Sequence, residues 1–151
     1  MFTTQITSEQ CATKVMEVVP KVMRFMRAEA RQQQQPLLSL SQLRVLGFLE
    51  RCPEASLSEV ADYFDVSRSS MSAMIERLVQ RNLVNRIEDP KERRRVNLTL
   101  TTTGTEYLHQ VYQLIRSQLA DVLANLSDAQ LRQVMEGIAL LGEAFKDFKA
   151  P

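Results

Sequence analysis

The chain has 151 residues and a net charge of +1; 44% of the residues are hydrophobic and 25% are charged, enough for one packed domain and a second subdomain. No stretch approaches the roughly 18 apolar residues of a membrane span, and MFTTQITSEQ lacks the basic and then apolar pattern of a signal peptide, so we expect a cytoplasmic protein without a membrane partner. Two cysteines and one histidine are too few for a disulfide framework or a zinc site, and four glycines leave little material for a catalytic loop, so we expect no metal, no cofactor and no enzyme.

The N-terminal part predicts one long helix and one short one. Apolar residues at helical spacing predict the first from Ser8 to about Arg31, with Pro20 kinking or restarting it. Its apolar positions are Val15, Val18, Val19, Val22 and Met26. QQQQP at 32–36 reads as a linker. The capping box Ser39-Leu-Ser-Gln42 then opens a short helix that ends at Arg51, before Pro53.

Two further helices form a helix-turn-helix pattern. Ser56-Leu-Ser-Glu59 reads as a second capping box, the chain turns at Asp65-Val66, and Ser67 caps the next helix. The apolar face of that helix comprises Met71, Met74, Ile75, Leu78 and Val79, and its opposite face Ser69, Ala73, Glu76, Arg77 and Gln80. The helix ends at Asn82, which tolerates the left-handed conformation that helix ends often need.

A charged β-hairpin follows. Residues 83–87 and 96–100 alternate as strands, and the turn-forming EDPKERRR lies between them. A hairpin after a helix-turn-helix is a wing, and its tip carries Lys91, Arg93, Arg94 and Arg95, which suit the negative minor groove of DNA. A solvated edge hairpin is the alternative for such a sequence taken alone.

The positive charge is concentrated in these two elements. Residues 67–95 hold eight of the nineteen Arg and Lys residues but four of the eighteen Asp and Glu residues, so this segment carries +4 and the remainder −3. A basic segment in an acidic chain indicates a surface for a polyanion, and a solvated face of mixed charge is the alternative.

The C-terminal part predicts two apolar helices. The first has a coiled-coil-like seam of Leu108, Val111, Ile115, Leu119, Val122 and Leu126. Ser127-Asp-Ala-Gln130 caps the second, whose apolar side comprises Leu131, Val134, Met135, Ile138, Leu141, Phe145 and Phe148. These faces need a partner, which is either a second subunit or a bundle within one chain.

The run SLSEVADYFDVSRSSMSAMIERLVQRNLVNRIEDPKERRRVNLTLTTTG resembles the winged helix-turn-helix of the MarR family, the multiple antibiotic resistance type of transcriptional regulators. The similarity extends over about residues 15–146, and its most specific part is the wing, Asp89-Pro-Lys-Glu-Arg-Arg-Arg95 followed by Leu100-Thr101 and Gly104. Glu92 stands where the family usually has Asp, and Asn82 where it usually has Gly. Glu92 keeps a carboxylate that can hold a neighbouring wing arginine.

The resemblance implies a mainly α fold with a small antiparallel β-wing. It places an N-terminal dimerisation helix at 1–35, a winged helix-turn-helix DNA-binding domain at 36–101 and C-terminal dimerisation helices at 102–151. The helices at both ends are expected to intertwine with those of a second subunit. The expected dimerisation residues are Val15, Val19, Val22, Leu108, Val111, Ile115, Leu119, Val122, Leu131, Ile138 and Phe145.

The implied function is transcriptional regulation, with a homodimer repressing from a pseudo-palindromic double-stranded DNA operator. We expect Ser69 and Arg77 to meet base edges, with Arg77 suited to guanine, and Ala73 to touch a thymine methyl. Arg94 is the expected minor-groove probe. The expected phosphate contacts are Ser67, Arg68, Ser70, Ser72, Arg86, Lys91, Arg93 and Arg95. A winged-helix module that binds only protein partners is the alternative.

Regulation is also an expectation from the resemblance. Members of the family commonly sense small aromatic acids or lipophilic compounds between the dimer helices and the winged domain, and some sense oxidants through a cysteine of the first helix. Cys11 lies near the start of the predicted first helix and is the candidate redox residue; an inert thiol is the alternative.

Overall fold

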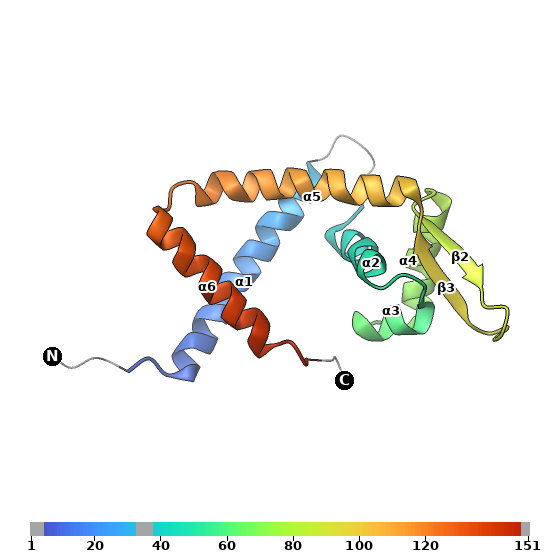
Figure 1. The fold of residues 1–151 in the computed structure, drawn as a ribbon, viewed down its shortest axis with the longest axis horizontal. Coiled ribbons are helices and arrows are strands. Elements are labelled where there is room, and N and C mark those ends of the chain that lie inside the picture. Colours follow the sequence, from blue (N-terminus) through green and yellow to red (C-terminus); the bar gives the residue numbers. More distant parts are fainter. Residues whose placement is uncertain (1–4, 33–37, 149–151) are drawn as a thin grey trace. The chain divides into compact units, whose positions relative to one another are not determined.

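The computed structural model describes residues 5–32 and 38–148. The chain divides into two compact units, Met1–Leu40 and Ser41–Pro151, and each is described by itself. The element order is α1, α2, β1, α3, α4, β2, β3, α5, α6 (Figure 1). The predicted fold class, mainly α with a small antiparallel sheet, is therefore confirmed.

Helix α1 (Ser8–Arg31) forms the first unit. Its N-terminus is closed by a full capping box, because the Thr7 hydroxyl accepts from the Gln10 amide at 3.2 Å and the Gln10 side chain accepts from the Thr7 amide at 3.0 Å. The helix runs through Pro20 without a break, so the expected restart is wrong. The expected linker at 32–36 lies outside the described residues except for Gln32, the C-cap of α1.

The core of the second unit joins the helix-turn-helix to its neighbours. Helices α2 (Leu40–Arg51), α3 (Leu57–Tyr63) and α4 (Arg68–Gln80) lie close to their predicted bounds. The largest fully buried side chains are Leu43, Leu46, Leu49, Met71, Ile75, Leu78, Leu98, Leu108, Val45, Val60 and Val84. Each contributes about 1.5–3 kcal/mol by leaving water, so this core holds α4 in a fixed orientation.

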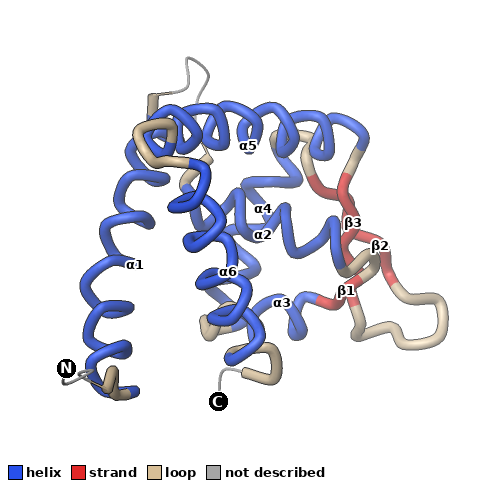
Figure 2. The backbone as a smooth tube through the Cα atoms, turned by 60° about the vertical axis from the view of Figure 1, so that its left-hand side comes forward, coloured by secondary structure: helices blue, strands red, loops and turns tan. Residues whose placement is uncertain are grey.

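A three-stranded antiparallel sheet completes the unit, in the order β1-β3-β2. Strand β2 (Val84–Glu88) pairs with β3 (Val96–Leu100), which confirms the predicted hairpin with a shift of one residue at its start. Strand β1 (Ala55–Ser56) pairs with the other edge of β3 and was not predicted. Figure 2 shows the strands side by side, with the loop between β2 and β3 projecting beyond the helices.

Three described residues other than glycine have a positive φ, and two of them, Asn82 and Asp65, lie at the predicted helix end and turn. Asn82 has φ 61°, and the bonds from Leu83 N to Leu78 O (3.0 Å) and from Asn82 N to Val79 O (2.9 Å) form a Schellman motif at the end of α4. The predicted left-handed Asn82 is confirmed. Asp65, with φ 53°, makes the predicted turn between α3 and α4.

The start of helix α5 (Thr102–Leu123) is bonded to the turn between α4 and β2. Thr101 donates from its hydroxyl to Asn82 O at 2.6 Å and from its amide to Leu83 O at 3.1 Å. At Gly104, a Cβ atom would lie 2.1 Å from Leu83 O, so only glycine fits there without a shift of the backbone.

The seam of α5 divides into two halves. Leu108, Val111 and Ile115 are buried within this single chain, where α5 packs on α2, and the Tyr112 hydroxyl donates to Leu43 O at 3.4 Å. His109, on the exposed side of α5, pairs with Glu50 of α2. The first three seam residues are therefore core residues of one chain, whereas in the second half of α5 Leu119 is half-buried and Val122 is exposed.

Helix α6 (Asp128–Ala144) has no buried residue. Its start carries the predicted capping box, with Ser127 and Gln130 bonded reciprocally at 3.2 and 2.9 Å. Several of its large apolar residues lie in solvent, including Met135, Ile138 and Leu140, which are 64–73% exposed. Phe145 is the C-cap, so Phe148 lies beyond the helix.

Candidate nucleic-acid interface

The N-terminus of α4 presents a cluster of serine hydroxyls. The Ser67 hydroxyl accepts from the Ser70 amide at 3.1 Å, and it also lies 2.9 Å from the Ser70 hydroxyl and 3.2 Å from that of Ser69. All three residues are exposed. Because free amides and the positive end of the helix dipole gather at a helix start, this corner suits a phosphate. Ser67 already uses its hydroxyl to cap the helix.

The outward face of α4 forms a stripe of exposed residues along the helix. Ser69, Ala73, Glu76 and Gln80 follow one another at intervals of four, three and four positions, and Arg77 is exposed beside them. Within the described part of the chain, no residue pairs with the Arg77 side chain. Since Met71, Ile75 and Leu78 are buried on the other side, the core aims this stripe outward.

Arg86 of β2 is tied to this helix. Its guanidinium lies 3.2 Å from the Glu76 carboxylate and donates weakly to the Ser72 carbonyl and hydroxyl at 3.4 and 3.5 Å. Expected as a phosphate contact, Arg86 thus has intramolecular partners. Sequence reasoning placed Glu76 on the outward face but gave it no role, because α4 and β2 meet only in the folded unit.

The wing loop is held by its own backbone. Asp89 N donates to Arg95 O at 3.0 Å, Arg95 N donates to Glu92 O at 2.9 Å, and Lys91 N donates to the Asp89 carboxylate at 2.8 Å. These bonds present the side chains of Lys91, Arg93 and Arg94 to solvent.

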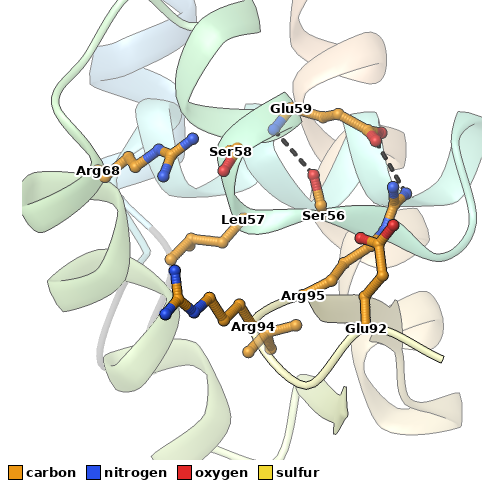
Figure 3. Close-up of a pocket in the computed structure, with 9 residues that line it drawn as sticks. Ser56, Leu57, Ser58, Glu59, Arg68, Glu92, Arg94 and Arg95 are labelled. Atoms are coloured by element: carbon orange, nitrogen blue, oxygen red, sulfur yellow. Dashed lines mark hydrogen bonds and ion pairs between the residues drawn. The ribbon is translucent and has the colours of Figure 1, made fainter. Parts of the chain in front are cut away.

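Arg95 fastens the wing to α3. Its guanidinium lies 2.9 Å from the Glu59 carboxylate (Figure 3). It also donates to Asn97 Oδ1 at 3.0 Å and lies 4.0 Å from the Asp89 carboxylate. We expected Arg95 to meet phosphate and Glu92 to hold a wing arginine, whereas Glu59 and Asp89 are the carboxylates that hold Arg95. The Glu59 carboxylate is engaged here, so the predicted capping box forms only through its Ser56 half, with Ser56 Oγ accepting from Glu59 N at 3.1 Å.

A hollow of about 480 Å³ lies between the starts of α3 and α4 and the wing. Arg68 of α4 points toward Ser58, and Arg94 of the wing lies beside Leu57 on another side of this hollow (Figure 3). Both side chains are exposed, and within the described part of the chain neither forms an ion pair. Helix α4 and the wing therefore each contribute one guanidinium group to the lining of this hollow.

A second, smaller cavity of about 180 Å³ is lined by Arg44 and Arg51 of α2, Tyr63 and Phe64 at the end of α3, and Tyr112 of α5. The Arg44 guanidinium stacks over the Phe64 ring, 5.4 Å from its centroid. Burial raises the pKa of Tyr112 above its ordinary value, and Arg51 and Arg44 partly oppose that rise. The phenol therefore keeps its proton at neutral pH and remains a donor.

Other expected features have these places in the structure. Cys11 and Cys52 are free and exposed. No helix in residues 5–32 and 38–148 combines the length and hydropathy that a membrane span requires. The same residues contain no cluster of three or more His, Cys, Asp or Glu suited to a metal ion.

Known proteins share both the sequence and the fold. The model of the MarR family matches residues 38–95, which include α2, the helix-turn-helix and the wing loop. The HTH-type transcriptional repressor MdtR of Bacillus subtilis is 31% identical over 104 residues, which cover 69% of this chain and 67% of MdtR. This chain belongs to the MarR family. It is a DNA-binding transcriptional regulator and not an enzyme.

Solved structures share the MarR fold over nearly the whole chain. RV1404 from Mycobacterium tuberculosis has a TM-score of 0.79 at 21% identity and covers 97% of this chain and 100% of its own. FabT of Streptococcus pneumoniae, solved in complex with DNA, has a TM-score of 0.72 at 15% identity and covers 95% and 100%. The MarR fold thus extends beyond the segment that the family model matches, through α5 and α6.

Proposed function

We propose that this MarR regulator is a homodimeric repressor that binds a pseudo-palindromic operator. The observation that carries the proposal is that one compact unit exposes both the α4 stripe and the wing cations. In a two-fold dimer, two such helices enter successive major grooves about 34–36 Å apart. The repressor sense is supported by the name of the relative MdtR, a transcriptional repressor.

We assign a DNA contact to each side chain from its position on α4 or the wing. In α4, Ser69 and Arg77 face base edges and Ala73 faces a thymine methyl. Arg94 enters the minor groove beside the wing. Phosphates are met by Arg68, Ser70, Lys91, Arg93 and the amides that follow Ser67. Arg95 acts by holding the wing. Arg86 and Ser72 are bonded to each other, so each can contact a phosphate only through donors that this bond does not use.

The dimer is supported by apolar surface that one chain leaves uncovered. In α6 and its C-cap, Val134, Ile138 and Phe145 are 36–64% exposed, and Val122 of α5 is 54% exposed. Monomeric proteins rarely expose such a row of large apolar side chains. We assign this surface, with the half-buried Leu119 and Leu131, to a second copy. In the first unit, Val15, Val19 and Val22 have the same proposed role.

We assign regulation to a small aromatic or lipophilic effector. The cavity lined by Arg44, Arg51 and Tyr112 supports an aromatic acid, because two guanidinium groups and a phenol hydroxyl suit a carboxylate and the rings of Tyr63 and Phe64 suit an arene. Its volume of about 180 Å³ is close to that of a cavity of about 150 Å³ that holds a benzene ring.

Oxidation of Cys11 is the second candidate mode of regulation, supported by the exposure of its thiol. Treatment with peroxide tests it. Loss of DNA binding in the parent protein but not in Cys11→Ser supports oxidation as the signal, and equal responses exclude it. We also propose that the regulator acts in the cytoplasm, because a DNA-binding regulator works where its operator lies.

Three measurements test the proposed function. Sedimentation of the purified protein should give a dimer. Selection from a randomised duplex pool should return a pseudo-palindrome, and anisotropy titration on that duplex should show log K falling with log salt at a slope of several units. A monomer would contradict the dimer, and no binding to any duplex at low salt would favour a module for protein partners.

A further inference from the structure

The Glu76 carboxylate lies in the middle of a surface built for an anion. At 3.6 residues per turn, Ser69 and Gln80 lie within about 40° of Glu76 around α4, whereas Arg77 lies about 100° away. Glu76 therefore occupies the centre of the exposed stripe, and its side chain is 50% exposed. A phosphate-binding surface gains nothing from a negative charge at this place.

The structure holds this carboxylate in position. Arg86, at 3.2 Å, approaches it from β2 and is itself bonded to the Ser72 carbonyl, one helical turn before Glu76. Arg86 is paired in the sheet with Leu98, a fully buried residue of β3. The ion pair thus connects the recognition face to the rigid core and restricts the rotamers of Glu76.

A fixed carboxylate discriminates between base edges. An ionised carboxylate only accepts hydrogen bonds. In the major groove, the N7 and O6 of guanine and the O4 of thymine are also acceptors and repel it, whereas the amino groups of cytosine and adenine donate. The N7 of adenine adjoins its amino group, so cytosine is the base that a carboxylate suits best.

We propose that Glu76 is a specificity-determining residue that accepts a hydrogen bond from the cytosine N4 amino group in each operator half-site, and that Arg86 positions it. The inference rests on the proposed function, in which α4 enters the major groove. The cationic contacts attract any duplex. Glu76 would add a contact that disfavours most base sequences. The guanidinium of Arg86 retains N–H groups that Glu76 and Ser72 do not use, so it can still donate to a nearby phosphate.

Selection from a randomised duplex pool tests the role of Glu76, with parent, Glu76→Gln and Glu92→Gln proteins compared in parallel. The parent should require cytosine at one position of each half-site, and Glu76→Gln should lose that preference by roughly tenfold or more in relative affinity. Glu92→Gln is the matched control, because it removes a carboxylate from the wing and not from α4. It should strengthen binding to all sequences equally and leave the preferences unchanged.

Arg86→Gln tests the positioning role. If Arg86 aligns Glu76, this variant weakens the same cytosine preference, and the double variant with Glu76→Gln loses little more. A merely phosphate-binding Arg86 would instead lower affinity for every sequence and reduce the salt slope by about one, which would overturn the positioning role.

Two results overturn the specificity of Glu76. One is an unchanged cytosine preference in Glu76→Gln, and the other is equally tighter binding of that variant to all duplexes. In both cases the parent still binds its operator, so the proposed function stands. A parent that binds no duplex overturns the proposed function and this inference together.

Discussion

The helix-turn-helix with its wing and the C-terminal helix α6 differ in how far they bury their apolar side chains. In the first region, α4 buries Met71, Ile75 and Leu78, and the wing is fastened by Arg95 to Glu59. In the second, no residue of α6 is buried, although Ile138 and Phe145 are large and apolar. One region is completed within a single chain, whereas the other lacks the surface that would cover it. Recognition and assembly are therefore separable, and each can be changed alone.

The largest expected effect is on assembly. Ile138→Glu puts an unpaired charge into the proposed interface, at a cost of several kcal/mol if the site is buried in the dimer. Sedimentation should then give a monomer. Gln133→Glu adds the same charge on the other side of α6 and should leave the dimer intact. An unchanged dimer for Ile138→Glu would remove this face from the interface.

A glycine-to-alanine substitution can be made in each region, and its effect on stability compared. Gly104→Ala forces a Cβ to within 2.1 Å of Leu83 O, so we expect a loss of about 1–3 kcal/mol or more in the free energy of unfolding. Gly137→Ala in α6 meets nothing within 4 Å and should gain about 0.5–1 kcal/mol from helix propensity. Urea unfolding measures both. A loss at Gly137 that depends on protein concentration would place a partner against this residue.

The wing probe should change binding and spare the fold. Arg94→Ala should weaken operator binding by about 1–3 kcal/mol and lower the salt slope by about one, because one cation leaves the phosphate-lined groove. The melting temperature should stay within a few degrees. Anisotropy titration at several salt concentrations is the measurement, and unchanged affinity with an unchanged slope would exclude Arg94 from the interface.

The smallest effect concerns the wing fastening. The Arg95 and Glu59 side chains are 39% and 52% exposed, so Glu59→Gln should change the free energy of unfolding by less than about 1 kcal/mol. Amide exchange in residues 89–95 should nevertheless speed up, because the wing loses a tether. Glu88→Gln is the control, since the described residues include no ion-pair partner for Glu88. Equal exchange in both variants would mean that the pair does not order the wing.

Local signals predicted most of the helices and the wing. Capping residues Ser67 and Ser127 marked two helix starts, and Asn82 marked a helix end, because each acts on backbone groups within a few residues. Strand β1 has two residues, too few for any alternation, and it depends on pairing with β3. Helix α1 continues through Pro20, contrary to the expected restart, since a long helix can tolerate the loss of one hydrogen bond.

Interactions between segments that are distant in the chain could not be predicted from the sequence. Glu59 was assigned to a local capping box, and its carboxylate instead meets Arg95, 36 positions away. The spacing of Leu108, Val111 and Ile115 predicted an apolar seam correctly, but periodicity does not tell whether α2 or another chain covers it. A charge count likewise found the basic segment without revealing that Glu76 and Arg86 neutralise each other.

The attachment of α5 has a mechanical consequence. Thr101 and Gly104 join its start to Asn82 and Leu83 at the end of α4, so the two helices turn as one piece. With 22 residues, α5 is a lever about 33 Å long. A tilt of about 5° around its far end would carry the α4 side by about 3 Å, close to the rise of about 3.4 Å per phosphate of one strand along the duplex axis. A small change in the angle of α5 at its far end would thus move α4 by about one nucleotide step along the DNA.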